Sequence, residues 1–315
     1  MSEIAVVGAG AWGTALAVQA ARAGCRVCLW ARRPERFVGG VSPHLPGVVL
    51  PATVRVEAAL PSAALILLAV PLQHLRRVAE ALPPGGPLVC CAKGVETGTG
   101  RLALEILAEA APARPAAVLS GPNFAHEVAA GLPAATVVAG PRMVREATAA
   151  SLATPAFRIY GNDDVVGVQV GGAAKNVVAI AAGAAIGAGL GENARAAIVT
   201  RGLAELARLA TALGGRAGTV AGLSGLGDLM LTCASAASRN FSLGLALGRG
   251  ATLVEVLASR EAVTEGVATA PALLARAAAE GVDLPVCAAV TGVVEGRFGL
   301  RSAMESLLSR PRKDE

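Results

Sequence analysis

The chain has 315 residues, which is long enough for two domains that each bury a hydrophobic core. Hydrophobic residues make up 54% and aromatic residues only 3% of it, which excludes a disordered polymer and indicates an interior of closely packed small aliphatic side chains. The net charge of +5 is mild and forms no basic stripe, so we expect no nucleic-acid partner, whereas anionic small ligands would fit.

The N-terminal half alternates short aliphatic runs with Ala-rich helical stretches, a pattern typical of βαβ units on a mainly parallel sheet. The predicted strands are residues 4–8, 26–30, 65–70, 87–91, 116–120, 136–139 and 157–160. At the N-terminus no basic stretch precedes an apolar one, so we predict no export and a cytoplasmic location.

A glycine-rich motif follows the first predicted strand and opens a helix. Gly8, Gly10 and Gly13 have the G-x-G-x-x-G spacing. The first glycine permits a tight turn, the second lets the backbone approach a pyrophosphate, and the third lets the helix pack on the strand. Free N–H groups at the helix N-terminus then face the phosphates. The alternative is that the glycines only shape a turn, but strand, motif and helix in register favour a dinucleotide site.

The second predicted strand is followed by Arg32 and Arg33, with no carboxylate to hold the ribose diol of NAD. Because guanidinium groups pair well with a 2′-phosphate, we predict that NADPH is preferred over NADH. The alternative is a solvated surface arginine pair.

The six cysteines all lie in apolar segments, and we expect them to be reduced core thiols. Cys25 and Cys28 form a C-x-x-C, but neither a second pair nor a nearby histidine completes a zinc site, so we predict no metal. A redox role for this pair is the alternative that the sequence leaves open.

Two polar segments come directly after predicted strands, at the edge where open α/β sheets bind ligands. Lys93 follows one strand, and the loop from Ser120 to Ala125 follows the next. Gly94 indicates that a backbone or ligand approaches closely beside the lysine. The alternative is an ordinary loop lysine.

From residue 163 onward the alternation stops, and long helical segments follow with turns at Gly214-Gly215, residues 248–250 and Gly281. We therefore predict a dinucleotide-binding Rossmann domain over residues 1–162 and an all-helical substrate-binding and catalytic domain over residues 163–315.

The apolar run 177–190 is shorter than the roughly 20 residues of a membrane-spanning helix and is interrupted by glycines. It predicts a buried core helix and no membrane insertion.

Lys175 is the only charged residue between Asp164 and Glu192, in a stretch otherwise rich in Ala, Val, Ile and Gly. Desolvation lowers the pKa of a lysine toward neutrality, which suits a group that exchanges a proton. The alternative is a lysine that snorkels to solvent from a helix end.

Asp228 and Thr232 are four residues apart on a predicted helix and share one face, although Asp228 could also cap that helix.

Ser238, Arg239 and Asn240 place a hydroxyl, a fork of donors and an amide together at a predicted helix start. Such a trio would hold a phosphate. Ser and Asn also cap helices without any ligand, so the tripeptide alone decides nothing.

Seven motifs in order along the chain resemble bacterial NAD(P)-dependent glycerol-3-phosphate dehydrogenase. They are GAGAWG, KGVE, SGPNFAHEV, KNVVAIAAG, GLSGLGDLMLTC, SRN and TEGVAT at Thr264–Thr269. The resemblance implies reversible reduction of dihydroxyacetone phosphate to sn-glycerol 3-phosphate with NADPH or NADH, for phospholipid synthesis, by a homodimer.

The resemblance also implies roles for individual residues, with Lys175 as the proton acceptor for the alcohol. The implied substrate contacts are Lys93, Gly121, Asn123, Lys175, Asp228, Ser238, Arg239 and Asn240. The implied cofactor contacts are Ala11, Trp12, Arg32, Arg33, Lys93, Ala125, Arg239, Val263 and Glu265. Two positions depart from the family: Ala11 stands where Ser is frequent, and Asn123 where Ser or Thr is frequent.

As a mechanism, we expect Lys175 to protonate the developing alkoxide while Lys93 and Asp228 hold the carbonyl end. Asn176 and Thr232 are expected to hydrogen-bond the substrate hydroxyls. Two alternatives stay open: another two-domain dehydrogenase, acting on hydroxy acids or ketopantoate, and a noncatalytic dinucleotide sensor.

Overall fold

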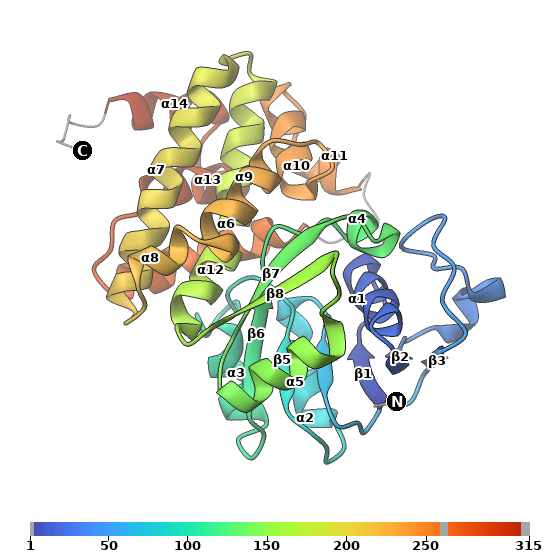
Figure 1. Cartoon of the computed structure of the whole chain (residues 1–315). Helices are drawn as coiled ribbons and strands as arrows, with labels where there is room; N and C mark the ends of the chain where they lie inside the picture. The colour runs from blue at the N-terminus through green and yellow to red at the C-terminus, as the bar shows by residue number, and fades with distance from the viewer. Residues whose placement is uncertain (1–2, 259–263, 310–315) are drawn as a thin grey trace. The chain divides into compact units, whose positions relative to one another are not determined.

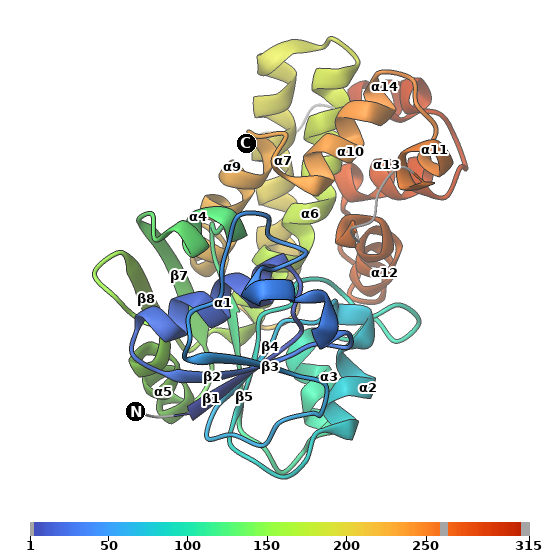
Figure 2. The same cartoon turned by 90° about the vertical axis from the view of Figure 1, so that its right-hand side faces the viewer.

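Residues 3–258 and 264–309 are described by a computed structural model, shown in two orientations in Figures 1 and 2. The chain divides into two units. The first comprises residues 1–93 and 101–169, and the second comprises residues 94–100 and 170–315. Each unit has its own architecture, which we describe in turn.

The strands of the first unit form one sheet in the order β3-β2-β1-β4-β5-β6-β7-β8. They are β1 Glu3–Val7, β2 Arg26–Trp30, β3 Val54–Glu57, β4 Ile66–Leu68, β5 Leu88–Cys90, β6 Ala116–Ser120, β7 Ala134–Ala139 and β8 Phe157–Asn162. All neighbouring pairs are parallel except β6 and β7, which are antiparallel. The predicted mainly parallel sheet is confirmed.

Both faces of this sheet are covered, which explains why the central strands β4 and β5 are apolar at every position. In β1, Ile4 and Val6 join a core cluster on one face, whereas Ala5 and Val7 join a cluster on the other. The helices of the first face are α1 Ala11–Arg22, α4 Ala125–Ala130 and α5 Arg142–Leu152, and those of the second are α2 Leu75–Ala81 and α3 Ala103–Ala110 (Figure 2).

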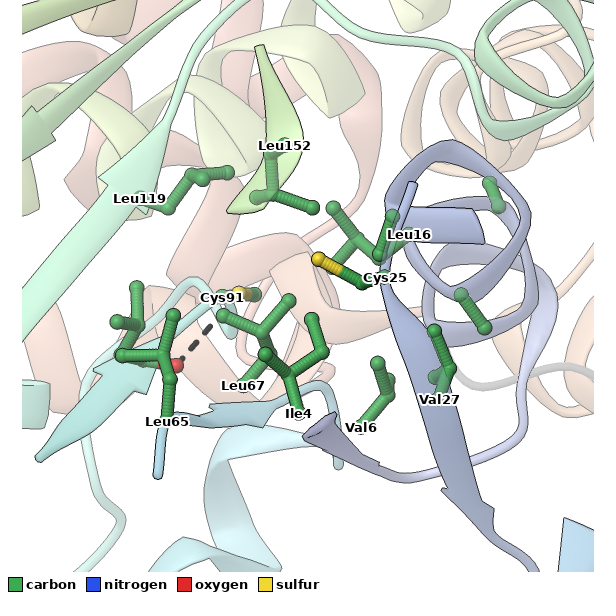
Figure 3. Packing of buried hydrophobic residues seen from close by; sticks show 14 of the residues in the cluster. Ile4, Val6, Leu16, Cys25, Val27, Leu65, Leu67, Cys91, Leu119 and Leu152 are labelled. Carbon is green, nitrogen blue, oxygen red and sulfur yellow. Dashed lines mark hydrogen bonds between the residues drawn. The ribbon is translucent and has the colours of Figure 1, made fainter. Parts of the chain in front are cut away.

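The cysteines are core residues, as predicted. All six are buried, and none of them forms a disulfide bond in the described structure. Cys25 and Cys91 pack among the aliphatic side chains of the first face, beside Leu16 and Leu67 (Figure 3). Burial, followed by the neighbouring carboxylate of Glu57, raises the pKa of Cys28 to about 12, so its reactive thiolate form is disfavoured.

Strand β3 is missing from the sequence prediction. It is a four-residue edge strand that pairs only with β2, and its two charged residues, Arg55 and Glu57, are partly or fully exposed. The alternation in Val-Arg-Val-Glu is its only local signal. The other strands differ from their predicted bounds by at most two residues at either end.

The second unit is built from helices, as predicted. These are α6 Val165–Gly187, whose first turn belongs to the first unit, α7 Gly191–Ala212, α8 Ala217–Val220, α9 Asp228–Cys233, α10 Arg239–Gly248, α11 Leu253–Ala258, α12 Glu265–Ala279, α13 Pro285–Val294 and α14 Leu300–Leu308. The predicted glycine turns follow α7, α10 and α12 (Figure 1).

Helix α6 is longer than the apolar run that predicted it. Its length and hydropathy would suffice to cross a membrane, but 83% of its most apolar 18-residue window is buried inside the protein. This burial agrees with the predicted core helix. The charged side chain that interrupts the helix, Lys175, is the starting point of the site in the second unit.

Candidate functional site

The glycine motif forms a tight turn between β1 and α1. Gly8 has a φ of +114°, and a Cβ there would lie 2.7 Å from the carbonyl carbon of Ala69. A Cβ on Gly13 would lie 1.7 Å from the carbonyl oxygen of Gly8, so only glycine lets α1 start this close to the strand. By contrast, nothing lies within 4 Å of the position that a Gly10 Cβ would take.

This open space lies at the N-terminus of α1, which begins at Ala11 and has Gly10 as its N-cap without a side-chain hydrogen bond. The first N–H groups of a helix have no partner inside it, and its N-terminus is the positive end of its dipole. Both features fit a pyrophosphate, so the predicted dinucleotide residues, including Trp12 in the first turn, suit the cofactor.

Arg32 and Arg33 follow β2 and are exposed. Within residues 3–258 and 264–309, neither guanidinium takes part in an ion pair. The pair can therefore meet an incoming anion without first breaking a bond to a carboxylate.

The structure brings Lys93 and the loop after β6 together. The Nζ of Lys93 donates to the carbonyl oxygen of Gly121 over 3.2 Å. The loop itself is fixed on β7, because Thr136 Oγ1 donates to the carbonyl oxygen of Ser120 over 2.9 Å and a Cβ on Gly121 would lie 2.9 Å from the Cα of Thr136. The amide oxygen and nitrogen of Asn123, in the same loop, are buried and have no hydrogen-bond partner among the described residues. Unsatisfied buried polar atoms of this kind fit a ligand contact.

In the second unit, the amine of Lys175 lies between the side chains of Asp228 and Thr232. It forms a short ion pair with Asp228 Oδ1 and donates to Thr232 Oγ1 over 3.0 Å, and the same hydroxyl lies 3.3 Å from Asp228 Oδ1. The Lys175 and Asp228 side chains are only 10% and 1% exposed, so this lysine does not snorkel to solvent. The carboxylate stabilises the ammonium form, the form that can donate a proton.

A close contact between glycines sets the position of Asp228. The residues before α9, Leu223–Gly227, form a π-helical turn, a feature that often occurs at functional sites. A Cβ on Gly171, one turn before Lys175 in α6, would lie 2.9 Å from the Cα of Gly225 in this turn. The two backbones therefore approach closely enough for Asp228 to reach the lysine.

Ser238, Arg239 and Asn240, at the start of α10, have different environments. Ser238 is the N-cap and accepts from the N–H of Phe241 over 3.2 Å, as its alternative interpretation predicted. Asn240 is buried: its Nδ2 donates to Asn176 Oδ1 over 2.9 Å, and its Oδ1 accepts from the N–H of Gly266 over 3.0 Å. Of the three, Arg239 is the exposed residue at the first position of the helix.

Two predicted cofactor residues lie at the start of α12. Glu265 is its first residue and is partly buried, and Val263 lies outside the described residues. The N-cap, Thr264, has a buried hydroxyl without a hydrogen-bond partner in the described part of the chain. Ala125, the remaining predicted cofactor residue, is the first residue of α4 and packs on the sheet.

Cys233 lies at the end of α9, beside the Lys175 pair, where its thiolate form is disfavoured. Burial raises its pKa to about 12, although Lys175 and Arg195 partly oppose this. Among the described residues, no group of three or more His, Cys, Asp and Glu side chains has the arrangement of a metal site.

Comparison with known proteins decides the family. The model of the NAD-dependent glycerol-3-phosphate dehydrogenase N-terminus matches residues 3–145, and that of the C-terminus matches residues 164–305. The chain belongs to this family. The glycerol-3-phosphate dehydrogenase (NAD(P)+) of Acidiphilium cryptum is similar to it, with 55% identity over 319 residues that cover 99% of this chain and 98% of the relative.

Two further members of the glycerol-3-phosphate dehydrogenase family agree. That of Rhodospirillum rubrum is 51% identical over 329 residues, covering 100% of this chain and 94% of its own. The crystal structure of the Coxiella burnetii glycerol-3-phosphate dehydrogenase matches with a TM-score of 0.94 at 36% identity, over 98% of this chain and 99% of that chain.

Membership of the glycerol-3-phosphate dehydrogenase family confirms four predictions from the sequence: the family, the fold class, the reduction of dihydroxyacetone phosphate to glycerol 3-phosphate, and the use of NADPH or NADH. Family membership excludes the two alternatives that the sequence left open, which were a dehydrogenase of hydroxy acids or ketopantoate and a noncatalytic dinucleotide sensor. Phospholipid synthesis follows from the activity. The roles of individual residues remain predictions.

Proposed function

We propose that Lys175 is the general acid and base with which this glycerol-3-phosphate dehydrogenase interconverts dihydroxyacetone phosphate and sn-glycerol 3-phosphate. The observation that carries the proposal is the position of its buried amine, between the Asp228 carboxylate and the Thr232 hydroxyl. In the reducing direction, bound NADPH or NADH supplies the hydride. The ammonium group of Lys175 gives its proton to the ketone oxygen, and in the reverse direction the neutral amine takes it back.

Other residues have supporting roles in this proposal. Asp228 keeps the amine charged and oriented, and the Thr232 hydroxyl holds the same nitrogen from a second side. Lys93 supplies positive charge where negative charge grows on the oxygen. Arg239, exposed at the start of α10, binds the phosphate together with the N–H groups of that helix end.

Three further proposals complete the function. NADPH is preferred over NADH, which the exposed Arg32 and Arg33 support because neither has a carboxylate partner in the described structure. Residues 1–162 form the cofactor-binding domain and contribute Lys93 to substrate binding, and residues 163–315 form the domain that binds the substrate and carries out the proton transfer. The enzyme is a cytoplasmic homodimer, a state that light scattering on the purified protein would test.

The experiment that tests the proposal replaces Lys175. Lys175→Ala should lower kcat by about two to four orders of magnitude, the usual contribution of a general acid, while NADPH binding measured by fluorescence stays within about twofold. Lys175→Arg is the matched control: it retains a positive charge for Asp228, but a guanidinium does not release its proton. Near wild-type kcat in either variant would remove Lys175 from this role.

A further inference from the structure

The hydroxyl of Ser120 has no partner, although the side chain is buried. Ser120 ends β6 and is 2% exposed, and its Oγ has no hydrogen-bond partner in the described part of the chain. Other buried hydroxyls of the same unit do have partners: Thr148 donates to the carbonyl oxygen of Val144 and Ser151 to that of Ala147. An unsatisfied buried hydroxyl costs roughly 1–3 kcal/mol, so its persistence calls for an explanation.

Its surroundings point to a ligand. Ser120 and Asn123 together contribute three buried side-chain nitrogen and oxygen atoms that have no hydrogen-bond partner among the described residues. Between these two residues, the carbonyl oxygen of Gly121 accepts a hydrogen bond from Lys93. The residues that carry this hydroxyl, this amide and this ammonium group all follow or end the parallel strands β5 and β6, at the edge where open α/β sheets bind ligands.

The backbone that carries the hydroxyl is held rigidly. Thr136 Oγ1 binds the carbonyl oxygen of Ser120 itself, and Gly121 packs directly on the backbone of Thr136. The backbone at Ser120 is therefore fixed before a ligand arrives, and little backbone entropy is lost when the ligand binds.

We propose that Ser120 is a further substrate-binding residue, whose hydroxyl forms a hydrogen bond with an oxygen of the carbonyl and hydroxymethyl part of the triose phosphate. This inference rests on the proposed function. Such an oxygen accepts or exchanges a hydrogen bond with a hydroxyl and lies where the charge of Lys93 is useful. The pyrophosphate turn follows β1, which is three strands from β6, or about 14 Å at the usual strand spacing, so the cofactor phosphates are not the partner.

The test is Ser120→Ala, measured by thermal unfolding and by kinetics. Melting is compared for the protein alone, with NADPH, and with NADPH plus glycerol 3-phosphate, a pair that cannot react because both members are reduced. We expect the variant alone to melt at the wild-type temperature or higher, because the mutation removes an unsatisfied group. The NADPH shift should be unchanged and the additional glycerol 3-phosphate shift smaller, and KM for dihydroxyacetone phosphate should rise roughly 3- to 10-fold, the usual effect of losing one hydrogen bond.

Ser151→Ala is the matched control, because it removes a buried serine hydroxyl that already has a partner, 2.9 Å away. It should leave the glycerol 3-phosphate shift and KM unaltered. The proposal is overturned if Ser120→Ala leaves the wild-type glycerol 3-phosphate shift intact, or if it reduces the shift with NADPH alone. A wild-type protein that shows neither turnover nor a glycerol 3-phosphate shift would instead refute the proposed function, and this inference with it.

Discussion

Asn240 donates from its Nδ2 to the Oδ1 of Asn176 over 2.9 Å, while its own Oδ1 accepts from the N–H of Gly266 over 3.0 Å. One buried amide thus joins three helices: α10, which begins with Arg239; α6, at the residue after Lys175; and α12, at the residue after Glu265. One of its two N–H donors and its oxygen are thus engaged within the protein. We infer that the side chain of Asn240 positions the neighbouring residues of these three helices.

Asn240→Ala should therefore affect both stability and substrate binding. It leaves the Asn176 carbonyl and the Gly266 N–H without their partners, so the free energy of unfolding should fall by about 1–3 kcal/mol in chemical denaturation. KM for dihydroxyacetone phosphate should rise, because Arg239 loses the anchor beside it. Ser242→Ala, which removes only an exposed hydroxyl from the same helix, is the control. Wild-type stability of Asn240→Ala would contradict the bridging role.

Gly171→Ala should reduce activity more than it reduces stability. The new Cβ would lie 2.9 Å from the Cα of Gly225, so the π-helical turn must move and carry Asp228 away from Lys175. We expect kcat to fall roughly 10- to 100-fold, since small displacements of a catalytic group have effects of that order. Gly218→Ala is the control, because no atom lies within 4 Å of its Cβ position and alanine favours a helix. Equal kcat in the two variants would contradict this account of the glycine contact.

Glu205 makes the stability of the second unit depend on pH. The carboxylate is 2% exposed and accepts from the N–H groups of Val286 (2.7 Å) and Cys287 (3.2 Å) in the first turn of α13. Burial raises the pKa of Glu205 above 4.5 in spite of these hydrogen bonds. The folded state therefore holds this proton at pH values where the unfolded chain has released it, and the contribution of Glu205 to stability falls as pH rises from about 4.5 through the raised pKa.

Glu205→Gln removes this titration. We expect the difference in the free energy of unfolding, wild type minus variant, to decrease with rising pH over that window, as measured by denaturant titrations from pH 4.5 to 8. Glu280→Gln, an exposed carboxylate on the same unit, controls for the loss of one negative charge. Curves for wild type and Glu205→Gln that stay parallel would refute the assignment of this pH dependence to Glu205.

The cofactor preference should depend on Arg32 and Arg33. Replacing both by alanine should lower kcat/KM with NADPH roughly 10- to 100-fold, the effect of losing one or two charged hydrogen bonds to a phosphate. The value with NADH should change less than about threefold, because NADH has no 2′-phosphate. Arg36→Ala, another exposed arginine of the same segment, should change neither value. An equal loss with both cofactors would mean that the arginines do not read the 2′-phosphate.

The fold class and the dinucleotide site are visible in the sequence because their signals are local. Alternating aliphatic strands and helices identify the parallel sheet, and Gly8, Gly10 and Gly13 show their spacing within six residues. Strand β3 was not predicted, because an edge strand of four residues has too few buried positions to produce a pattern. The ordered motifs likewise identified the family, since each is a short run of the chain.

Only the tertiary structure decided which polar groups meet. The sequence predicted that Asp228 and Thr232 could reach Lys175, 53 and 57 positions away, but the direct contact depends on a close approach of two glycines that has no local pattern. Gly183, which the sequence shows only as an interruption of an apolar run, lies where a Cβ would be 2.1 Å from the carbonyl oxygen of Phe241. The partners of Asn240 and the unpaired hydroxyl of Ser120 also could not be predicted from the sequence, because hydrogen bonding depends on distances between segments and not on residue type alone.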